Sequence, residues 1–440
     1  MRNYPTVGIQ IPDVLLPNKS IDLSKWSVIA CDQFTSQPEY WNEVKEFVNQ
    51  SPSTLNLIFP EVYLGKLDEK PLIDKIRQSM RSYLENKIIE PVEGIILIER
   101  ISKAGNRHGL LIALDLEKYD FNKGTTSLIR ATEETIIDRL PPRIRIRENA
   151  ILELPHILVL IDDPEKTIIE PFCNKISNYS KIYDFDLMLG SGHLNGYLVN
   201  NVNIEKKMIE TLEKFTKSDY FQNKYGLTKN EAILLFAVGD GNHSLATAKA
   251  VWEKKKAKLS LDHPLRYALV EIENIHDPGL SFEAIHRVLF GIKQNVIEAL
   301  CNHFGNKAIF ITCQSYQEMI LKVEKSSSEK QIIGLTTSDY YRIMSIEQPT
   351  FNLPVGTLQE FLDAFLARGG AEGIDYIHGA DSLLNISQKP NNFGFYLPKM
   401  DKNELFRTVI LEGALPRKTF SMGEAKDKRF YLECRKIQEI

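Results

Sequence analysis

Apolar residues recur along the chain at two spacings, which predict helices and strands. Within residues 70–88 they fall three or four positions apart, as on one face of a helix, at Ile73, Ile76, Met80 and Leu84. Residues 94–102 and 109–117 are β-rich runs joined by a turn at Gly105-Asn106, which predicts a hairpin. Residues 232–238 form a near-continuous apolar run, which is typical of a strand buried on both faces of a sheet.

Further elements of both kinds fill the rest of the chain. We expect strands at 26–31 and 156–162, helices at 36–48, 164–179 and 203–224, and an arginine-rich segment at 129–149 broken at Pro141-Pro142. This pattern predicts a mixed α/β (α+β) fold with a central mixed sheet. Because 440 residues exceed one ordinary core, we expect an N-terminal lobe, residues 1–225, and a C-terminal lobe, residues 226–440, with a weakly marked boundary.

The composition narrows the classes of partner. The chain has 54 Lys and Arg residues against 58 Asp and Glu, so its formal charge of −4 gives no basic field for nucleic acid or an anionic membrane. The apolar runs are of strand length, and no apolar leader segment is evident. The five cysteines are widely spaced, which fits a reducing compartment. We therefore expect a cytoplasmic protein with a small-molecule substrate, and a homodimer is a compatible assembly.

The segment most suggestive of chemistry directly follows the apolar run and consists of Gly239, Asp240, Gly241, Asn242, His243 and Ser244. Two glycines let a ligand approach the main chain closely, and free N–H groups at the start of a helix bind anions. Asp240 could hold a metal ion or orient a hydroxyl group, His243 could donate to phosphate or move a proton, and Ser244 could contact phosphate. The alternative is a tight strand-to-helix turn in which Asp240 or Asn242 caps the helix.

Three other places carry candidate residues. Asp32 follows an early strand and could be a general base or a metal ligand, the alternative being a cap of the next helix. Arg130, which begins the arginine-rich segment, could clamp phosphate and Glu133 could act as a base; the alternative is a solvated helix face. Lys418 lies near two hydroxyl residues and could contact a nucleotide phosphate, the alternative being a basic loop before a strand.

The glycine-containing segment resembles a known family. Bacterial and archaeal proteins of domain-of-unknown-function family 1015 carry an apolar strand followed by Asp-Gly-His-His-Arg and a helix of small residues, and residues 237–248 here read AVGDGNHSLATA. Other blocks follow in the family's order: the early strand ending in Asp32, residues 109–119, the Glu-x-Thr element at 133–135, and residues 416–421, which resemble the family's Pro-x-Lys-Ser/Thr segment. The resemblance covers essentially the whole chain.

Two positions depart from the family pattern. Asn242 stands where the family has its first His, and Ser244 stands where it has Arg, so one natural phosphate clamp is missing. Arg130 or Lys418 could replace it. The motif is also similar, more distantly, to the phosphate-binding turn of the ParB–sulfiredoxin superfamily, which includes nucleotide-dependent kinases of free serine. By this analogy the resemblance implies a ParB/sulfiredoxin-like nucleotide-binding core.

These observations lead to the hypothesis of a nucleotide-dependent phosphotransferase that acts on a small hydroxyl metabolite such as free serine, or that runs the reverse dephosphorylation. ADP or ATP would place a phosphate on residues 239–244, with Mg²⁺ on Asp240. Asp32 or Glu133 would take the proton of the acceptor hydroxyl, and Arg130 and Lys418 would neutralise charge.

Two alternatives come from other classes. The first is a metal-dependent hydrolase, in which Asp240, His243 and His193 would be ligands of the metal ion. The second is a non-catalytic nucleotide-binding protein in which the ligand regulates a protein contact.

Overall fold

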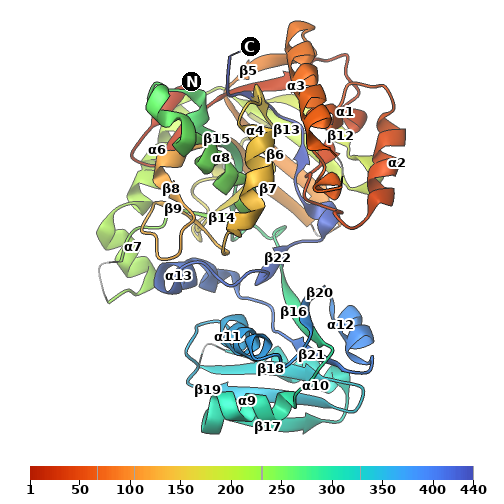
Figure 1. The fold of residues 1–440 in the computed structure, drawn as a ribbon. Coiled ribbons are helices and arrows are strands. Elements are labelled where there is room, and N and C mark those ends of the chain that lie inside the picture. The colour runs from red at the N-terminus through yellow and green to blue at the C-terminus, as the bar shows by residue number, and fades with distance from the viewer. Residues whose placement is uncertain (67, 104, 229–230, 328, 440) are drawn as a thin grey trace. The chain divides into compact units, whose positions relative to one another are not determined.

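The chain folds into two compact units, each built from helices and a sheet. The computed structural model describes residues 1–440 except 67, 104, 229–230, 328 and 440. Unit 1 consists of Met1–Ser281 together with Met422–Ile440, and unit 2 consists of Phe282–Ser421 (Figure 1). The mixed α/β class expected from the sequence is confirmed.

The lobe boundary expected near residue 226 falls inside unit 1. Strand β14 (Phe236–Asp240) lies after that boundary but pairs with β9 (Ile129–Ala131) and β11 (Leu158–Ile161), which lie before it. Hydrogen bonds between these strands join the chain before residue 226 to the chain after it. Unit 1 therefore contains both Asp32 and the segment 239–244.

Unit 1 is organised around an eleven-stranded mixed sheet. Its main path runs in the order β12 (Ser180–Asp186), β13 (His193–Val199), β6 (Ile95–Ser102), β7 (Gly105–Asp115), β15 (Tyr267–Asn274), β11, β14, β9 and β8 (Tyr119–Asp120), with β2 (Ile9–Ile11) paired to β7 and β1 (Arg2–Tyr4) paired to β2. The pairs β11–β15 and β9–β14 are parallel, whereas β11–β14 and β7–β15 are antiparallel. The predicted hairpin is confirmed, but its turn was predicted at the wrong place: Gly105 and Asn106 belong to β7 and pair with Ser102 and Ile101 of β6.

Helices cover both faces of this sheet (Figure 1). Alternate residues of β6 point to opposite faces, so Ile95 and Leu97 join one apolar cluster while Ile96 and Ile98 join another. The first cluster includes residues of α6 (Val202–Phe215) and α8 (Asn242–Lys255). The second includes residues of α2 (Pro38–Val48) and α3 (Glu69–Glu85). It also includes residues 430–434, which belong to the returning segment, the part of the chain that re-enters unit 1 after unit 2. Unit 1 therefore buries one core on each side of its sheet.

Two helix predictions and one predicted break need correction. Most of the helix predicted at 164–179 is absent, and α5 (Glu170–Cys173) is a single turn, because the Asp163 carboxylate accepts from the backbone N–H groups of Thr167 and Ile168 and closes a local turn instead. The helix predicted at 203–224 is divided into α6 and α7 (Ser218–Tyr225). Pro141-Pro142 does not break a helix but begins α4 (Leu140–Arg147), where proline is tolerated.

Residues 422–440 complete unit 1 through short strand pairs. In this segment β23 (Phe430–Tyr431) pairs with β4 (Val28–Ile29), and β24 (Arg435–Lys436) pairs with β10 (Leu152–Glu153). A third small sheet joins β3 (Asp13–Pro17) to β5 (Ile89–Glu93). The helix α1 (Leu23–Trp26) directly precedes β4. The segment thus connects parts of the chain that are far apart in sequence.

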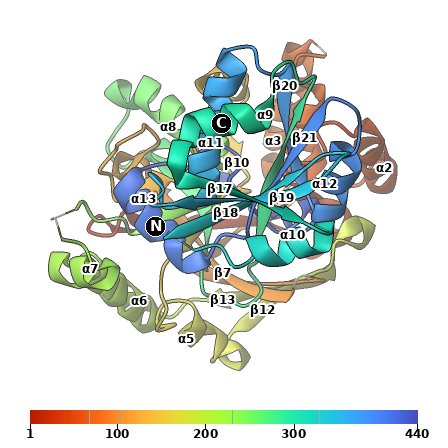
Figure 2. The same cartoon turned by 90° about the horizontal axis from the view of Figure 1, so that it is seen from below.

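Unit 2 is a smaller sheet with helices. The main path of its sheet is β17 (Ala308–Cys313), β19 (Tyr341–Glu347), β18 (Lys330–Thr336), β21 (Asn392–Tyr396), β16 (Phe282–Phe290) and β20 (Gly373–His378), with the short β22 (Phe420–Met422) off this path. Its helices are α9 (Val296–Phe304), α10 (Tyr316–Val323), α11 (Pro354–Ala367), α12 (Ala380–Ser387) and α13 (Lys402–Glu412) (Figure 2). Met319 and Val323 of α10 share an apolar cluster with Leu383 of α12.

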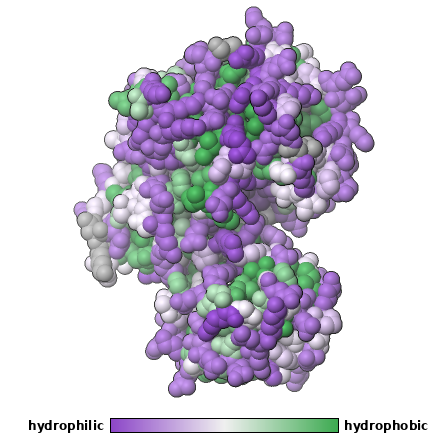
Figure 3. Space-filling model, viewed as in Figure 1, coloured by the Kyte–Doolittle hydropathy of each residue, from purple (hydrophilic) through white to green (hydrophobic). Residues whose placement is uncertain are grey.

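Hydrophilic residues cover most of the face of unit 1 seen in Figure 3. Among the described residues, no helix has both the length and the apolar character needed to cross a membrane.

The returning segment carries buried charges that are paired. Arg435 donates from Nε to Glu153 Oε1 at 2.6 Å, and Arg147 donates to the other oxygen of that carboxylate at 2.5 Å. The Leu269 N–H also donates to Glu153 Oε1, at 3.0 Å. Although burial raises the pKa of Glu153, the two arginines together hold it below its ordinary value. The Glu153 carboxylate therefore stabilises unit 1 as an ion.

Replacing Glu153→Gln should destabilise unit 1 by about 3–5 kcal/mol, because the buried Arg435 and the half-buried Arg147 lose their counter-charge. Urea unfolding followed by tryptophan fluorescence measures this, since Trp26, Trp41 and Trp252 all lie in unit 1. The pKa of Glu153 is lower in the folded than in the unfolded protein. The part of the destabilisation that depends on the Glu153 charge should therefore be complete above about pH 4.3, the pKa of an unfolded Glu, and should decrease as the pH falls through the folded-state pKa. Glu90→Gln, at an exposed position of β5, is the control. An unchanged unfolding midpoint would contradict the prediction.

Candidate functional site

The segment 239–244 forms the strand–turn–helix that the sequence predicts. Strand β14 ends at Asp240, Gly241 adopts a left-handed conformation with φ of +80°, and α8 begins at Asn242. A Cβ atom at Gly241 would lie 3.0 Å from the Ile157 Cα, so this turn requires glycine for its conformation and has little room for a side chain. The turn therefore packs directly against the start of β11.

The N-terminus of α8 has the features of an anion site. No side chain caps it, and its first turn holds no acidic residue. Backbone N–H groups at the start of a helix generally lack intrahelical partners, although the Ser244 N–H here donates to the Gly241 carbonyl at 2.9 Å, and the helix dipole adds positive potential there. The Asn242 Oδ1 atom is buried without a hydrogen-bond partner among the described residues. The turn therefore has a helix N-terminus that can bind an anion and, next to it, an amide oxygen that can accept a hydrogen bond or bind a cation.

Asp240 is held from two directions. Its Oδ1 accepts from the Gly241 N–H at 3.0 Å, and its Oδ2 lies 3.1 Å from Nζ of Lys428. The Lys428 side chain is only 11% exposed, so its charge is poorly screened by water. The ion pair places a cation beside the turn.

His243 is oriented by the segment that follows β9. Its Nε2 accepts from the Ile136 N–H at 3.2 Å, so the neutral ring carries its proton on Nδ1. The Thr132 hydroxyl donates to the Val238 carbonyl at 2.6 Å and ties the same segment to β14. Glu133 is the next residue and is half-buried. The segment 132–136 therefore lies along the turn.

A second group of residues surrounds Asp32, which follows β4. Asp32 Oδ2 lies 3.7 Å from His156 Nε2, and the Gln33 side chain donates to Oδ1 at 3.0 Å. His156 Nδ1 lies 2.7 Å from the hydroxyl of Tyr431. Because His156 comes just before β11, and Leu158 of β11 pairs with Asp240, this group lies at the same end of the sheet as the turn.

Glu61 and Arg143 form the outer part of the Asp32 group. The Arg143 guanidinium donates to the Glu61 carboxylate, and the Glu61 N–H donates to the Cys31 carbonyl at 2.8 Å. Burial raises the pKa of Glu61, and the nearby Asp32 charge adds to this rise while Arg143 opposes it. Two carboxylates thus lie close enough to affect each other's ionisation.

Electrostatics connect the turn to Asp32 through one lysine. Burial raises the pKa of Asp32, but His156, the Gln33 hydrogen bond and Lys428 outweigh it, so the pKa lies below its ordinary value. Lys428 also forms the ion pair with Asp240 described above. A single, largely covered ammonium group therefore acts on both Asp32 and Asp240.

Other predicted site residues have different surroundings. Arg130 is buried and donates to the carbonyls of Ser127 and Ala232, each at 2.8 Å, so it stabilises backbone in unit 1. Lys418, in a left-handed conformation with φ of +58°, belongs to unit 2. His193 contacts Asp184 and Asp186 on the surface of β12 and β13. The described residues contain no group of three or more His, Cys, Asp and Glu side chains placed to hold a metal ion.

Several members of the site give little sign of their role in the sequence. His156 opens a predicted strand, Arg143 is one of five arginines in its segment, and Glu61 lies between two predicted helices. Lys428 and Tyr431 lie in a charged stretch near the end of the chain that matches no motif. Only the fold brings these residues beside Asp32 and Asp240.

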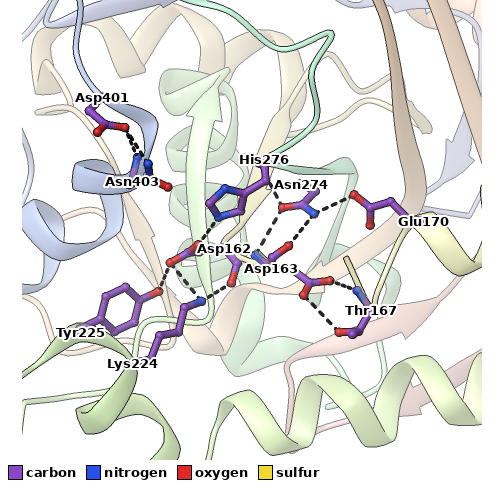
Figure 4. A network of polar contacts seen from close by, with 10 residues as sticks. All are labelled: Asp162, Asp163, Thr167, Glu170, Lys224, Tyr225, Asn274, His276, Asp401 and Asn403. Atoms are coloured by element: carbon purple, nitrogen blue, oxygen red, sulfur yellow. Dashed lines mark hydrogen bonds and ion pairs between the residues drawn. The ribbon is translucent and has the colours of Figure 1, made fainter. Parts of the chain in front are cut away.

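A polar cluster at the other end of β11 joins α7 to the end of β15 (Figure 4). Asp162 accepts from His276 Nε2 and from the Tyr225 hydroxyl, each at 2.7 Å, and lies 3.0 Å from Lys224 Nζ. Asn274 donates to the Asp163 carbonyl nearby at 2.8 Å. Asp162 is thus saturated with donors, and the cluster fastens α7 to the end of β15.

Unit 1 therefore defines a mixed α/β protein with a charged site at one end of its main sheet. The chain belongs to the family described as "Protein of unknown function (DUF1015)", which matches residues 15–365. No curated protein matches the sequence.

Solved structures with a similar fold are distant. A mutant free serine kinase in complex with AMP has 12% identity and a TM-score of 0.39, covering 74% of this chain and 92% of its own. A conserved hypothetical protein from Pyrococcus furiosus has 12% identity and a TM-score of 0.34, covering 73% and 90%. SbnI with a C-terminal truncation, from Staphylococcus aureus, has 12% identity and a TM-score of 0.35, covering 71% and 82%.

Replacing Lys428→Met should raise the pKa of Asp32, because burial already raises it and one of the opposing groups is lost. A pH titration of the Asp32 carboxyl by ¹³C NMR measures the change. Lys436→Met is the control, since Lys436 pairs with Glu439 at an exposed position. The same Asp32 pKa in wild type and Lys428→Met would show that Lys428 does not act on this carboxyl group.

Proposed function

We propose that the protein is a nucleotide-dependent phosphotransferase acting on the hydroxyl group of a small metabolite. The observation that carries the proposal is the position of Lys428, which forms an ion pair with Asp240 on the turn and lowers the pKa of half-buried Asp32. A phosphate on the turn and a hydroxyl group beside Asp32 would share this cation. Phosphoryl transfer needs mainly alignment and charge stabilisation, which such an arrangement supplies.

The turn is proposed to hold the nucleotide phosphates. The uncapped first turn of α8 would donate backbone hydrogen bonds to phosphate oxygens, as helix N-termini do in many phosphate sites. The His243 ring, whose Nε2 accepts from the Ile136 N–H, is a second group proposed to contact phosphate. Ser244 lies in the same first turn and is half-buried. These groups replace the arginine that the family motif has at this place.

Asp32 is proposed as the general base. Its pKa lies below the ordinary value, so the carboxylate is ionised at neutral pH and can accept a proton. Its side chain is 29% exposed, which leaves it open to an acceptor. In the transfer, the acceptor oxygen bonds to phosphorus, the bond from phosphorus to the leaving nucleotide oxygen breaks, and the acceptor proton passes to Asp32. Glu133, beside the turn, is the second candidate for this role.

The residues of the turn fit a phosphate-bound Mg²⁺ ion. Magnesium sites in phosphoryl-transfer proteins use one or two carboxylates together with phosphate oxygens, so they need no larger cluster of protein ligands. Asp240 supplies a carboxylate, and the Asn242 Oδ1 atom is a buried oxygen without a partner among the described residues. When bound, the ion would neutralise charge on the phosphate oxygens.

The acceptor is proposed to be a small hydroxyl compound, and free serine is the first to test. The same groups can catalyse the reverse reaction, in which a phosphorylated metabolite loses its phosphate.

ADP or ATP with Mg²⁺ should raise the melting temperature of the protein. At about 100 times its dissociation constant a ligand adds roughly 2.7 kcal/mol of stability. The double substitution Asp240→Ala/His243→Ala should abolish the increase, while Asp262→Ala/His263→Ala, a matched pair at another site, should retain it. If neither nucleotide changes the wild-type melting temperature, the phosphotransferase proposal is wrong.

Asp32→Asn should lower kcat for phosphoryl transfer by roughly 10²- to 10⁴-fold, the usual contribution of a general base, while nucleotide stabilisation persists. Transfer to serine and other hydroxyl acceptors is followed by ³¹P NMR. Glu46→Gln, on the exposed side of α2, is the control. Tight nucleotide binding without turnover on any acceptor would instead favour the non-catalytic nucleotide-binding protein.

A further inference from the structure

The hydroxyl group of Tyr431 connects the main chain of Cys31 to the ring of His156. Tyr431 is 2% exposed, so its hydroxyl must find its hydrogen-bond partners within the protein. Its oxygen accepts from the Cys31 N–H at 3.2 Å and lies 2.7 Å from His156 Nδ1. Because the Cys31 N–H can only donate, the phenol proton needs another acceptor, and the imidazole nitrogen His156 Nδ1 is a stronger acceptor than the Cys31 thiol that also contacts the hydroxyl.

This hydrogen bond determines the tautomer of His156. A nitrogen that accepts a proton from the phenol cannot carry one itself, so the neutral ring has its proton on Nε2. Nε2 lies 3.7 Å from Asp32 Oδ2, which is longer than a hydrogen bond but close enough for the N–H dipole to attract the carboxylate. The other tautomer would direct a lone pair at the Asp32 carboxylate and place an N–H against the phenol proton. Tyr431 therefore favours the one neutral form of His156 that presents a donor to Asp32.

The strand pair β4–β23 fixes both ends of this connection. Tyr431 pairs with Val28 and Phe430 with Ile29, and the same stretch of chain continues from β4 through Cys31 to Asp32. The rings of His156 and Tyr431 meet edge to face, with centroids 5.5 Å apart and planes at 90°. Rotation of the His156 ring would move Nδ1 away from the hydroxyl and break the bond between them. The geometry is thus set by backbone pairing rather than by flexible side chains alone.

We propose that Tyr431 is a positioning residue that holds His156 as the Nε2–H tautomer and, through it, orients Asp32 towards the acceptor hydroxyl. The catalytic part of this inference rests on the proposed phosphotransferase function. Tyr431 and His156 keep their protons throughout, and the acceptor proton passes only to Asp32. Tyr431 itself touches neither nucleotide nor acceptor in this scheme.

The first test is spectroscopic and does not depend on activity. In protein labelled with ¹⁵N-histidine, the ring nitrogen shifts of His156 at a pH where the ring is neutral should show a proton on Nε2. Tyr431→Phe should give a mixture of both tautomers. Tyr183→Phe is the matched control, because it removes another buried tyrosine hydrogen bond, to Glu433 at 2.7 Å, without contacting His156.

The second test is kinetic. Tyr431→Phe should lower kcat by roughly 10- to 100-fold, as loss of an orienting hydrogen bond around a catalytic group does, with the KM for nucleotide unchanged. His156→Gln should retain most of the rate, since its amide can accept from Tyr431 and donate to Asp32, whereas His156→Leu can do neither and should resemble Tyr431→Phe. Tyr183→Phe should retain the wild-type rate.

Each outcome decides the inference. A wild-type proton on Nδ1, or a Tyr431→Phe protein that keeps a single Nε2–H tautomer, overturns the role of Tyr431. A normal kcat for Tyr431→Phe overturns its link to Asp32. If wild-type protein transfers phosphate to no acceptor, the proposed function fails, while the NMR result still supports or refutes the control of His156 by Tyr431.

Discussion

The structure of unit 1 depends on the burial of paired charges along residues 428–435. Arg429 lies 3.1 Å from Glu271 and donates to Glu433 at 2.8 Å, and Arg435 is bound to Glu153. Removing such charges from water is costly unless the partners meet with good geometry. The pairs therefore permit few alternative positions for the segment. Once it is fixed in this way, the residues between and beside these arginines are fixed as well.

The site is a consequence of this fixed segment. Lys428 directly precedes Arg429, and Tyr431 follows it within β23, so the paired arginine is flanked by the residues that reach Asp240 and His156. The turn at Gly241 is preorganised by its own left-handed conformation and by the close approach of Ile157. Local backbone geometry thus provides the anion site, and long-range ion pairing supplies the charge beside it.

Local sequence patterns predicted much of the fold, whereas the features that depend on contacts between distant residues could not be predicted from them. The strand–turn–helix at 239–244 and the β6–β7 hairpin were predictable because glycine positions and apolar spacing act over a few residues. The helix expected at 164–179 failed because one side chain, Asp163, satisfied the backbone locally. Asp32 and Asp240 were recognisable as candidates, but the contact between Tyr431 and His156 joins residues 275 positions apart and has no local sign.

Unit 1 is interrupted in sequence, since residues 282–421 form unit 2 before the chain returns at Met422. During synthesis, the ribosome makes Asp32, His156 and the 239–244 turn long before Lys428 and Tyr431. Through that interval the nascent chain exposes Val28 and Ile29 without their strand partner and leaves Glu153 without Arg435. The charged site is accordingly among the last parts of the molecule to form, and a chain stalled within unit 2 would lack it.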